Sequence, residues 1–143
     1  YGHWAAKAAE RHMSVPPDPY WGEVPGWQVG SAVPSDELVV ITQCWDEIRR
    51  FMWNYVGIVR SYRRLIRARR RIETLREEIR EFYWHAAITR DLVELRNICT
   101  VAELIVSCAL QRRESRGLHC TLDYPELSTG LPSDTVLERR DLV

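Results

Sequence analysis

The sequence lacks the features that define several common classes of protein. No apolar run approaches the roughly 18 residues that a membrane-spanning helix needs, so we expect no membrane span. The four cysteines form no CxxC pair, and their spacing resembles neither a zinc site nor a secreted disulfide framework. The chain starts without methionine and without a signal peptide. We therefore expect a cytoplasmic protein with no metal site, present here as a fragment or a processed product.

An excess of charge of one sign is also missing. The 20 basic and 20 acidic residues balance, which argues against an overall attraction to nucleic acid or to an anionic membrane. The dinucleotide-binding fingerprint Gly-x-Gly-x-x-Gly does not occur, and Gly22, Gly26 and Gly30 have neither a strand before them nor a helix directly after them. We interpret these three as turn glycines, so the sequence predicts no nucleotide-binding turn.

Three long segments carry apolar residues at steps of three and four, the pattern of amphipathic helices. They cover residues 41–59, 65–82 and 88–109. The third segment has further apolar residues off its main stripe, among them Val101 and Ile105, so we expect it to be the most buried. Packed at shallow angles, the three segments predict an all-α fold, a three-helix bundle.

Capping residues suggest where these helices begin and end. Thr42, Ser61 and Thr89 can each cap the N-terminus of one helix, because a hydroxyl oxygen accepts hydrogen bonds from the free backbone N–H groups. Gly117 suits the left-handed position that follows a helix, so we expect it to end the third one.

The rest of the chain divides around this bundle. Residues 1–13 are predicted to be the end of a helix, and residues 14–41, rich in proline and glycine, an irregular connector. The three-helix domain is assigned to residues 42–127, with an extended strip at 118–125 where apolar and polar residues alternate before a proline. Residues 128–143 are weakly patterned and predicted to be a loose tail.

A dense basic run leads into the second helical segment and continues through its first part. It contains no acidic residue and comprises Arg60, Arg63, Arg64, Arg67, Arg69, Arg70 and Arg71. One interpretation is a solvated face whose arginines pair locally with the glutamates that follow between 73 and 81. An inter-domain contact and a phosphate-binding surface for nucleic acid are the alternatives, but the neutral net charge disfavours nucleic acid.

Three stretches together resemble one family of enzymes. They are FMWNYVGIVR at 51–60, DLVELRN at 91–97 followed by VAELI, and RESRGLH at 113–119 followed by LDYPE. In order and spacing they are similar to the C-terminal region of L-aspartate oxidases, within the succinate dehydrogenase/fumarate reductase flavoprotein family. The third stretch matches the ESRG-x-H signature of that whole family, and the resemblance covers roughly residues 39–127.

The resemblance implies an FAD-dependent enzyme that oxidises L-aspartate to iminoaspartate, the first step of de novo NAD biosynthesis through quinolinate. In this family the residues that bind substrate and move protons lie in the flavin and capping domains, and none of them maps onto this chain. The resemblance therefore predicts no catalytic, cofactor-binding or metal residue here. FAD would belong to the full-length enzyme, and residues 1–13 to the tail of the preceding flavin domain.

The expected partners are the flavin and capping domains of the same enzyme. Glu114, Arg116 and His119, where the chain turns back after the third helix, are the candidate domain-docking residues. A face that normally meets the other domains would be exposed, so either self-association or marginal stability as a monomer is also expected. A stand-alone helical module that binds another protein is the alternative function.

Overall fold

The computed structural model describes residues 1–13, 25–26, 32–33 and 38–138 of the 143-residue chain. The chain divides into two compact units, residues 1–30 and 31–143. Helix α1 (Gly2–Met13) belongs to the first unit and buries no side chain. It confirms the helix predicted for residues 1–13. Most of the predicted connector, residues 14–41, lies outside the described residues.

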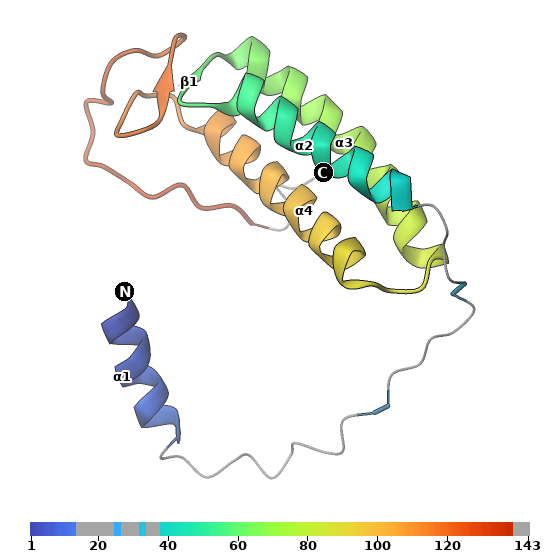
Figure 1. The fold of residues 1–143 in the computed structure, drawn as a ribbon. Helices are drawn as coiled ribbons and strands as arrows, with labels where there is room; N and C mark the ends of the chain where they lie inside the picture. The colour runs from blue at the N-terminus through green and yellow to red at the C-terminus, as the bar shows by residue number, and fades with distance from the viewer. Residues whose placement is uncertain (14–24, 27–31, 34–37, 139–143) are drawn as a thin grey trace. The chain divides into compact units, whose positions relative to one another are not determined.

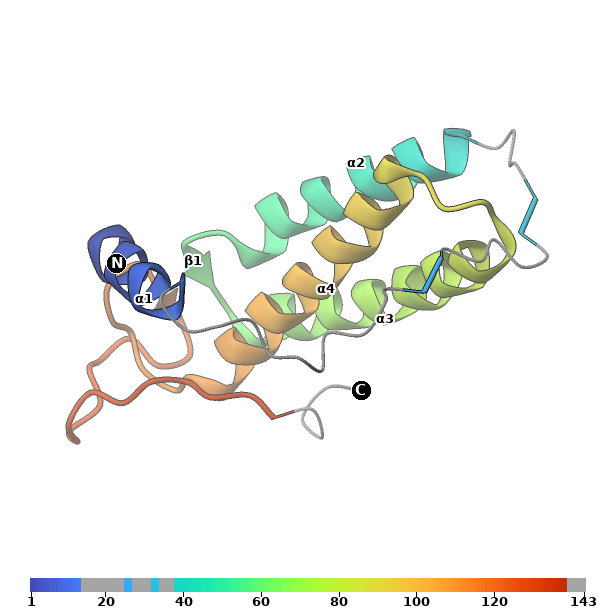
Figure 2. The same ribbon diagram turned by 90° about the horizontal axis from the view of Figure 1, so that it is seen from below.

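The second unit is built on three long helices that run side by side (Figures 1 and 2). They are α2 (Leu38–Val56), α3 (Tyr62–His85) and α4 (Arg90–Gln111). Two-residue strands β1 (Val59–Arg60) and β2 (Cys120–Thr121) pair in parallel. This strand pair lies at the end of the bundle where α2 and α4 finish and α3 begins (Figure 1). The prediction of an all-α three-helix bundle is confirmed.

The core forms where the apolar stripes of the three helices meet. Its most buried large side chains are Ile48 of α2, Ile72 of α3, and Leu92, Leu95 and Val106 of α4. Ala68 has no exposed surface at all, and a small residue there allows close approach of the helices. The spacing of three and four residues along the sequence therefore translates directly into one buried seam.

Two of the three predicted N-caps are confirmed. The Ser61 hydroxyl accepts a hydrogen bond from the N–H of Arg64, and the Thr89 hydroxyl accepts one from the N–H of Leu92. The prediction for Thr42 is wrong, because α2 begins at Leu38 and Thr42 lies inside it. The added turn brings Ile41 into the core, and burying an apolar side chain favours the longer helix.

The predicted end of the third helix is also wrong. Helix α4 stops at Gln111, and Arg112 is its C-cap, with its N–H bonded to the carbonyl of Cys108. Gly117 does adopt the left-handed conformation, with φ 59°. It uses it in a separate turn, which is closed by paired backbone hydrogen bonds between Arg116 and His119. Only a short part of the predicted extended strip forms a strand, namely β2.

Helix α4 contributes six buried apolar residues to the core, against five from α3. Its second apolar face is not covered within the described part of the chain, because Val101 is 51% exposed and Ile105 is 41% exposed. No helix among the described residues combines the length and apolar character that a membrane crossing needs.

Leu95→Ala should destabilise the bundle by about 2–5 kcal/mol, because truncating a buried leucine loses apolar burial and leaves a cavity. Leu95 is only 1% exposed. Urea unfolding followed by circular dichroism measures the loss. Val101→Ala on the exposed face of the same helix is the control and should cost well under 1 kcal/mol. Equal losses for the two variants would contradict the assigned core.

Candidate functional site

The candidate site is a cluster of polar side chains at the end of α4, built around the carboxylate of Glu114. This carboxylate is buried, with the residue 7% exposed. Arg112 Nη2 lies 3.0 Å from its Oε1, and Arg116 Nε donates to its Oε2 at 3.0 Å. The backbone N–H of Ser128 donates to the same Oε2 at 3.1 Å. Three donors from three places along the chain thus converge on one acid.

These contacts keep Glu114 ionised. The hydrogen bond from the Ser128 N–H holds the pKa of Glu114 below its ordinary value, and Arg116 and Arg112 add to the effect against the opposing influence of burial. A charged carboxylate with charge-assisted hydrogen bonds is the form that fixes the loop geometry best. The cluster is therefore held together by an ionised carboxylate.

Ser115, the next residue, organises the loop that follows. Its hydroxyl accepts a hydrogen bond from the N–H of Thr121 at 2.9 Å and donates to the carbonyl of Tyr124 at 2.8 Å. Its backbone N–H donates to the carbonyl of Glu126 at 3.0 Å. A single small residue thus ties the end of α4 to β2 and to the chain that follows it.

The ring of His119 contacts both the end of α4 and a residue that lies far from it in the sequence. Its Nδ1 is 2.7 Å from Nη1 of Arg60, which precedes it by 59 positions. Its Nε2 is 3.3 Å from the carbonyl oxygen of Arg112. Since a guanidinium can only donate, Nδ1 must accept and the ring proton must reside on Nε2. His119 is therefore a neutral imidazole with both nitrogens engaged.

The surroundings of His119 favour this neutral form. Burial lowers the pKa of His119, and the positive charge of Arg60 lowers it further. Arg60 is itself held in place by its Nε, which donates to the carbonyl of Gly57 at 2.8 Å. The imidazole is thus positioned as a hydrogen-bond bridge between β1 and the end of α4.

A third contact closes the N-terminus of α3. The backbone N–H of Tyr62 donates to Oδ2 of Asp123 at 2.6 Å, and the Ser61 hydroxyl caps the same turn. A helix N-terminus that follows a parallel strand could hold the pyrophosphate of a dinucleotide. Here the carboxylate of Asp123 takes that position, and the turn from Arg60 to Tyr62 contains no glycine. The N-terminus of α3 therefore does not fit an FAD phosphate site.

The three candidate docking residues fall into one cluster but do not all touch. Glu114 and Arg116 form an ion pair, whereas the ring of His119 contacts the backbone carbonyl of Arg112 and its backbone pairs with that of Arg116. The sequence alone did not identify Arg112 or Ser128 as partners, since neither stands out in a pattern. Arg60 stood out only as part of the basic run and as the last residue of the stretch at 51–60, with no indication that it would meet His119. Long-range pairing of this kind leaves no periodic signal.

The described residues give no support for a metal site or for a reactive thiol at Cys99. They contain no group of three or more His, Cys, Asp or Glu side chains arranged to hold a metal ion. Burial raises the pKa of the Cys99 thiol to about 11, so it remains protonated and unreactive at neutral pH.

The arginines of the basic run differ in their partners. Arg69 pairs with Glu73 one turn along α3, as the solvated-face interpretation predicts, at 3.0 Å. Arg71 reaches across to Glu47 of α2 at 3.1 Å instead. Within the described part of the chain, Arg63, Arg64 and Arg70 take part in no ion pair. Local pairing thus accounts for only part of the run.

The stability of the bundle should depend on the protonation of His119. Its pKa is lowered in the folded state, so the unfolded chain binds the proton more readily and folding stability is lost as pH falls below about 6.5. His119→Asn keeps an acceptor near the Nδ1 position but cannot titrate. We expect the wild-type unfolding free energy to fall more steeply between pH 7 and 5 than that of the variant.

Urea unfolding at several pH values measures this difference. The window above pH 5 also lies above the range in which Glu114 would lose its charge, because the pKa of that group is lowered from about 4.5. Parallel slopes for the two proteins would show that His119 does not stabilise the fold as a neutral ring.

Comparison with known proteins shows which family has a similar sequence. Residues 45–141 match the family described as fumarate reductase flavoprotein C-term. The chain is 52% identical over 132 residues to an L-aspartate oxidase of Pseudomonas aeruginosa, covering 91% of this chain and 24% of that protein. It is 39% identical over 111 residues to a chloroplastic L-aspartate oxidase of Oryza sativa, covering 74% of this chain and 17% of that protein.

A solved structure shares the fold. The structure is that of Mycobacterium smegmatis Sdh1 in complex with UQ1, with a TM-score of 0.54 and 25% identity over 89% of this chain and 20% of the other. The chain thus spans about a quarter or less of the length of the curated relatives it matches. With the match extending over most of the bundle and the Glu114 cluster, the chain belongs to the fumarate reductase flavoprotein C-terminal family.

Proposed function

We propose that this chain is the C-terminal helical domain of an FAD-dependent L-aspartate oxidase. The complete cytoplasmic enzyme oxidises L-aspartate to iminoaspartate, the first step of NAD biosynthesis through quinolinate. The observation that carries the proposal is the identity of more than half of the aligned residues with bacterial L-aspartate oxidases, for example 56% over 108 residues with the protein of Acinetobacter baylyi. That alignment covers 76% of this chain and 20% of the relative.

Within that enzyme the domain acts as structure, and catalysis belongs elsewhere. General acid–base catalysis needs a group free to exchange a proton with substrate. Both ring nitrogens of His119 are engaged, and the Glu114 carboxylate already accepts from three donors. The N-terminus of α3 is closed by Asp123. We assign FAD, which supplies the hydride acceptor, to the flavin domain, and the closed N-terminus of α3 supports this assignment.

The role of the Glu114 cluster is to hold a docking surface for the flavin and capping domains. The strands and loop that it fixes expose apolar side chains, which are Ile58, Val59, Leu118 and Leu122. Exposed apolar residues gathered on rigid backbone are typical of an interface. Glu114, Arg116 and His119 act through the shape of this loop and touch no substrate.

The first test is oxidation of L-aspartate with added FAD, measured as hydrogen peroxide. The longer gene product should form peroxide, whereas the 143-residue chain should not and should purify colourless. If the longer product does not respond to aspartate, the proposed activity is wrong, and the stand-alone interaction module becomes the better interpretation. A chain that purifies yellow would contradict the assignment of FAD to another domain.

The second test separates structure from catalysis in the longer enzyme. Arg116→Ala removes one of the three donors to Glu114 and should lower the thermal midpoint. Turnover per folded molecule and the KM for aspartate should stay near wild type. Arg113→Ala, an exposed neighbour, is the matched control and should leave the midpoint unchanged. A large fall in turnover at normal thermal stability would instead place Arg116 in the chemistry.

A further inference from the structure

The charges on the outer face of α3 are arranged against the preference of the helix itself. A helix favours acidic residues near its N-terminus and basic residues near its C-terminus. Helix α3 has no acidic residue in its first turn; six of its eight arginines lie in the first half, and three of its four glutamates, Glu77, Glu78 and Glu81, lie in the second half. A pattern that opposes local stability calls for a cause outside the helix.

These charges form one exposed stripe. With 3.6 residues per turn, Arg63, Arg67, Arg70 and Thr74 lie on the same side of the helix as Glu78 and Glu81. All six are exposed, whereas the opposite side carries the buried core residues of α3. The stripe is thus basic on one side of Thr74 and acidic on the other.

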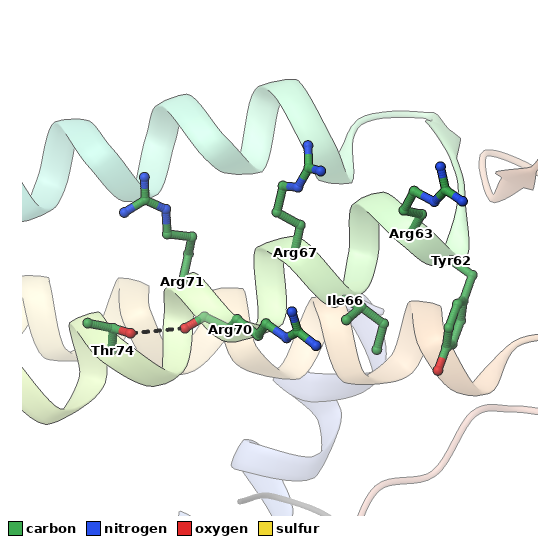
Figure 3. A pocket seen from close by; sticks show the side chains of 7 residues that line it. All are labelled: Tyr62, Arg63, Ile66, Arg67, Arg70, Arg71 and Thr74. Atoms are coloured by element: carbon green, nitrogen blue, oxygen red, sulfur yellow. Dashed lines mark hydrogen bonds between the residues drawn. The ribbon is translucent and has the colours of Figure 1, made fainter.

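The basic half of this stripe also borders a groove in the surface of α3. Tyr62, Ile66 and the arginines at 63, 67, 70 and 71 line a groove of about 560 Å³ that ends at Thr74. Figure 3 shows Arg63, Arg67 and Arg71 projecting toward α2, with Tyr62 and Ile66 on the other side of the groove. On the apolar side of this groove, Tyr62 is 58% exposed.

We propose that a second copy of this chain binds here, so that two α3 helices pack antiparallel about a two-fold axis at Thr74. In such a pair, a residue after Thr74 lies level with the residue equally far before it on the second copy. Arg70 and Glu78 are each four positions from Thr74, and Arg67 and Glu81 are each seven. Arg67 and Arg70 therefore each come level with a glutamate of the second copy.

The same symmetry places an apolar anchor in the groove. Trp84 is 74% exposed and lies on the same side of α3 as Ile66. It is ten positions from Thr74, so on the second copy it comes level with the interval between Tyr62 and Ile66. A tryptophan that fills a groove, surrounded by ion pairs, is the usual composition of an interface centre.

Thr74 suits the axis because it is small and its hydroxyl is already satisfied, donating to the carbonyl of Arg70 at 3.2 Å. Two such residues permit close approach of the helices without burying an unpaired polar group. The pairing does not depend on the enzymatic activity, and it gives the expected self-association a defined geometry.

Charge reversal tests the pairing. Arg67→Glu with Arg70→Glu places like charges opposite each other at four points, and so does Glu78→Arg with Glu81→Arg. Sedimentation velocity should show a dimer for the wild-type chain that weakens with added salt, and a dissociation constant raised about tenfold or more for each double variant. Mixing the two variants should restore the dimer, because every pair across the interface is then opposite in charge.

The control is Arg49→Glu with Arg50→Glu, which makes the same change of net charge at exposed positions of α2 and should leave the dimer intact. A monomeric wild-type chain at high concentration, or a mixture that fails to associate, would overturn the proposal. So would a longer gene product that stays monomeric while the chain dimerises, since the rest of the enzyme would then cover α3.

Oxidative cross-linking decides the matter if a reversed variant does not fold. Thr74→Cys should yield a covalent dimer, since the two new thiols would face each other at the axis. Thr100→Cys is matched to it, because Thr100 is exposed on α4 and donates to the carbonyl four residues earlier in the same way. It should remain uncross-linked, and equal cross-linking at both positions would refute the axis.

Discussion

The buried carboxylate of Glu114 is the constraint on which the end of this domain depends. An ionised carboxylate removed from water must be matched by donors, or the buried charge destabilises the fold. Arg112, Arg116 and the Ser128 N–H supply them. Because these groups come from the helix end, the following turn and the chain beyond β2, one charge determines the path of residues 112–128.

The consequences of that path extend to the other helices. Once the loop is fixed, β2 lies parallel to β1, and Asp123 reaches the free N–H of Tyr62 at the start of α3. His119 meets Arg60 for the same reason. The bundle is thus stabilised in two ways, by an apolar seam along its length and by a polar cluster across its end. Among the described residues, no buried side-chain polar atom lacks a partner, which favours a scaffolding role for this cluster over a catalytic one.

The sequence predicts the parts of this structure that depend on short-range order. Apolar residues at steps of three and four locate all three helices, and Ser61 and Thr89 cap α3 and α4 as their chemistry requires. It fails where a tertiary contact outweighs a local preference. Thr42 could cap a helix, but burial of Ile41 extends α2 past it. Gly117 could end α4, but the helix already ends at Gln111, and the ion pairs of Glu114 hold the residues that follow in a non-helical turn.

The candidate site shows the same division. Glu114, Arg116 and His119 are recognised because they form a short motif, whereas the 59-residue separation between Arg60 and His119 leaves no local trace. The pairing of Arg71 with Glu47 on another helix is equally invisible in the basic run. The sequence does show one arrangement of charge that is locally unfavourable. Arginines at the positive N-terminal end of α3 weaken that helix. Their presence on its exposed face is explained if the stripe binds a partner outside the bundle.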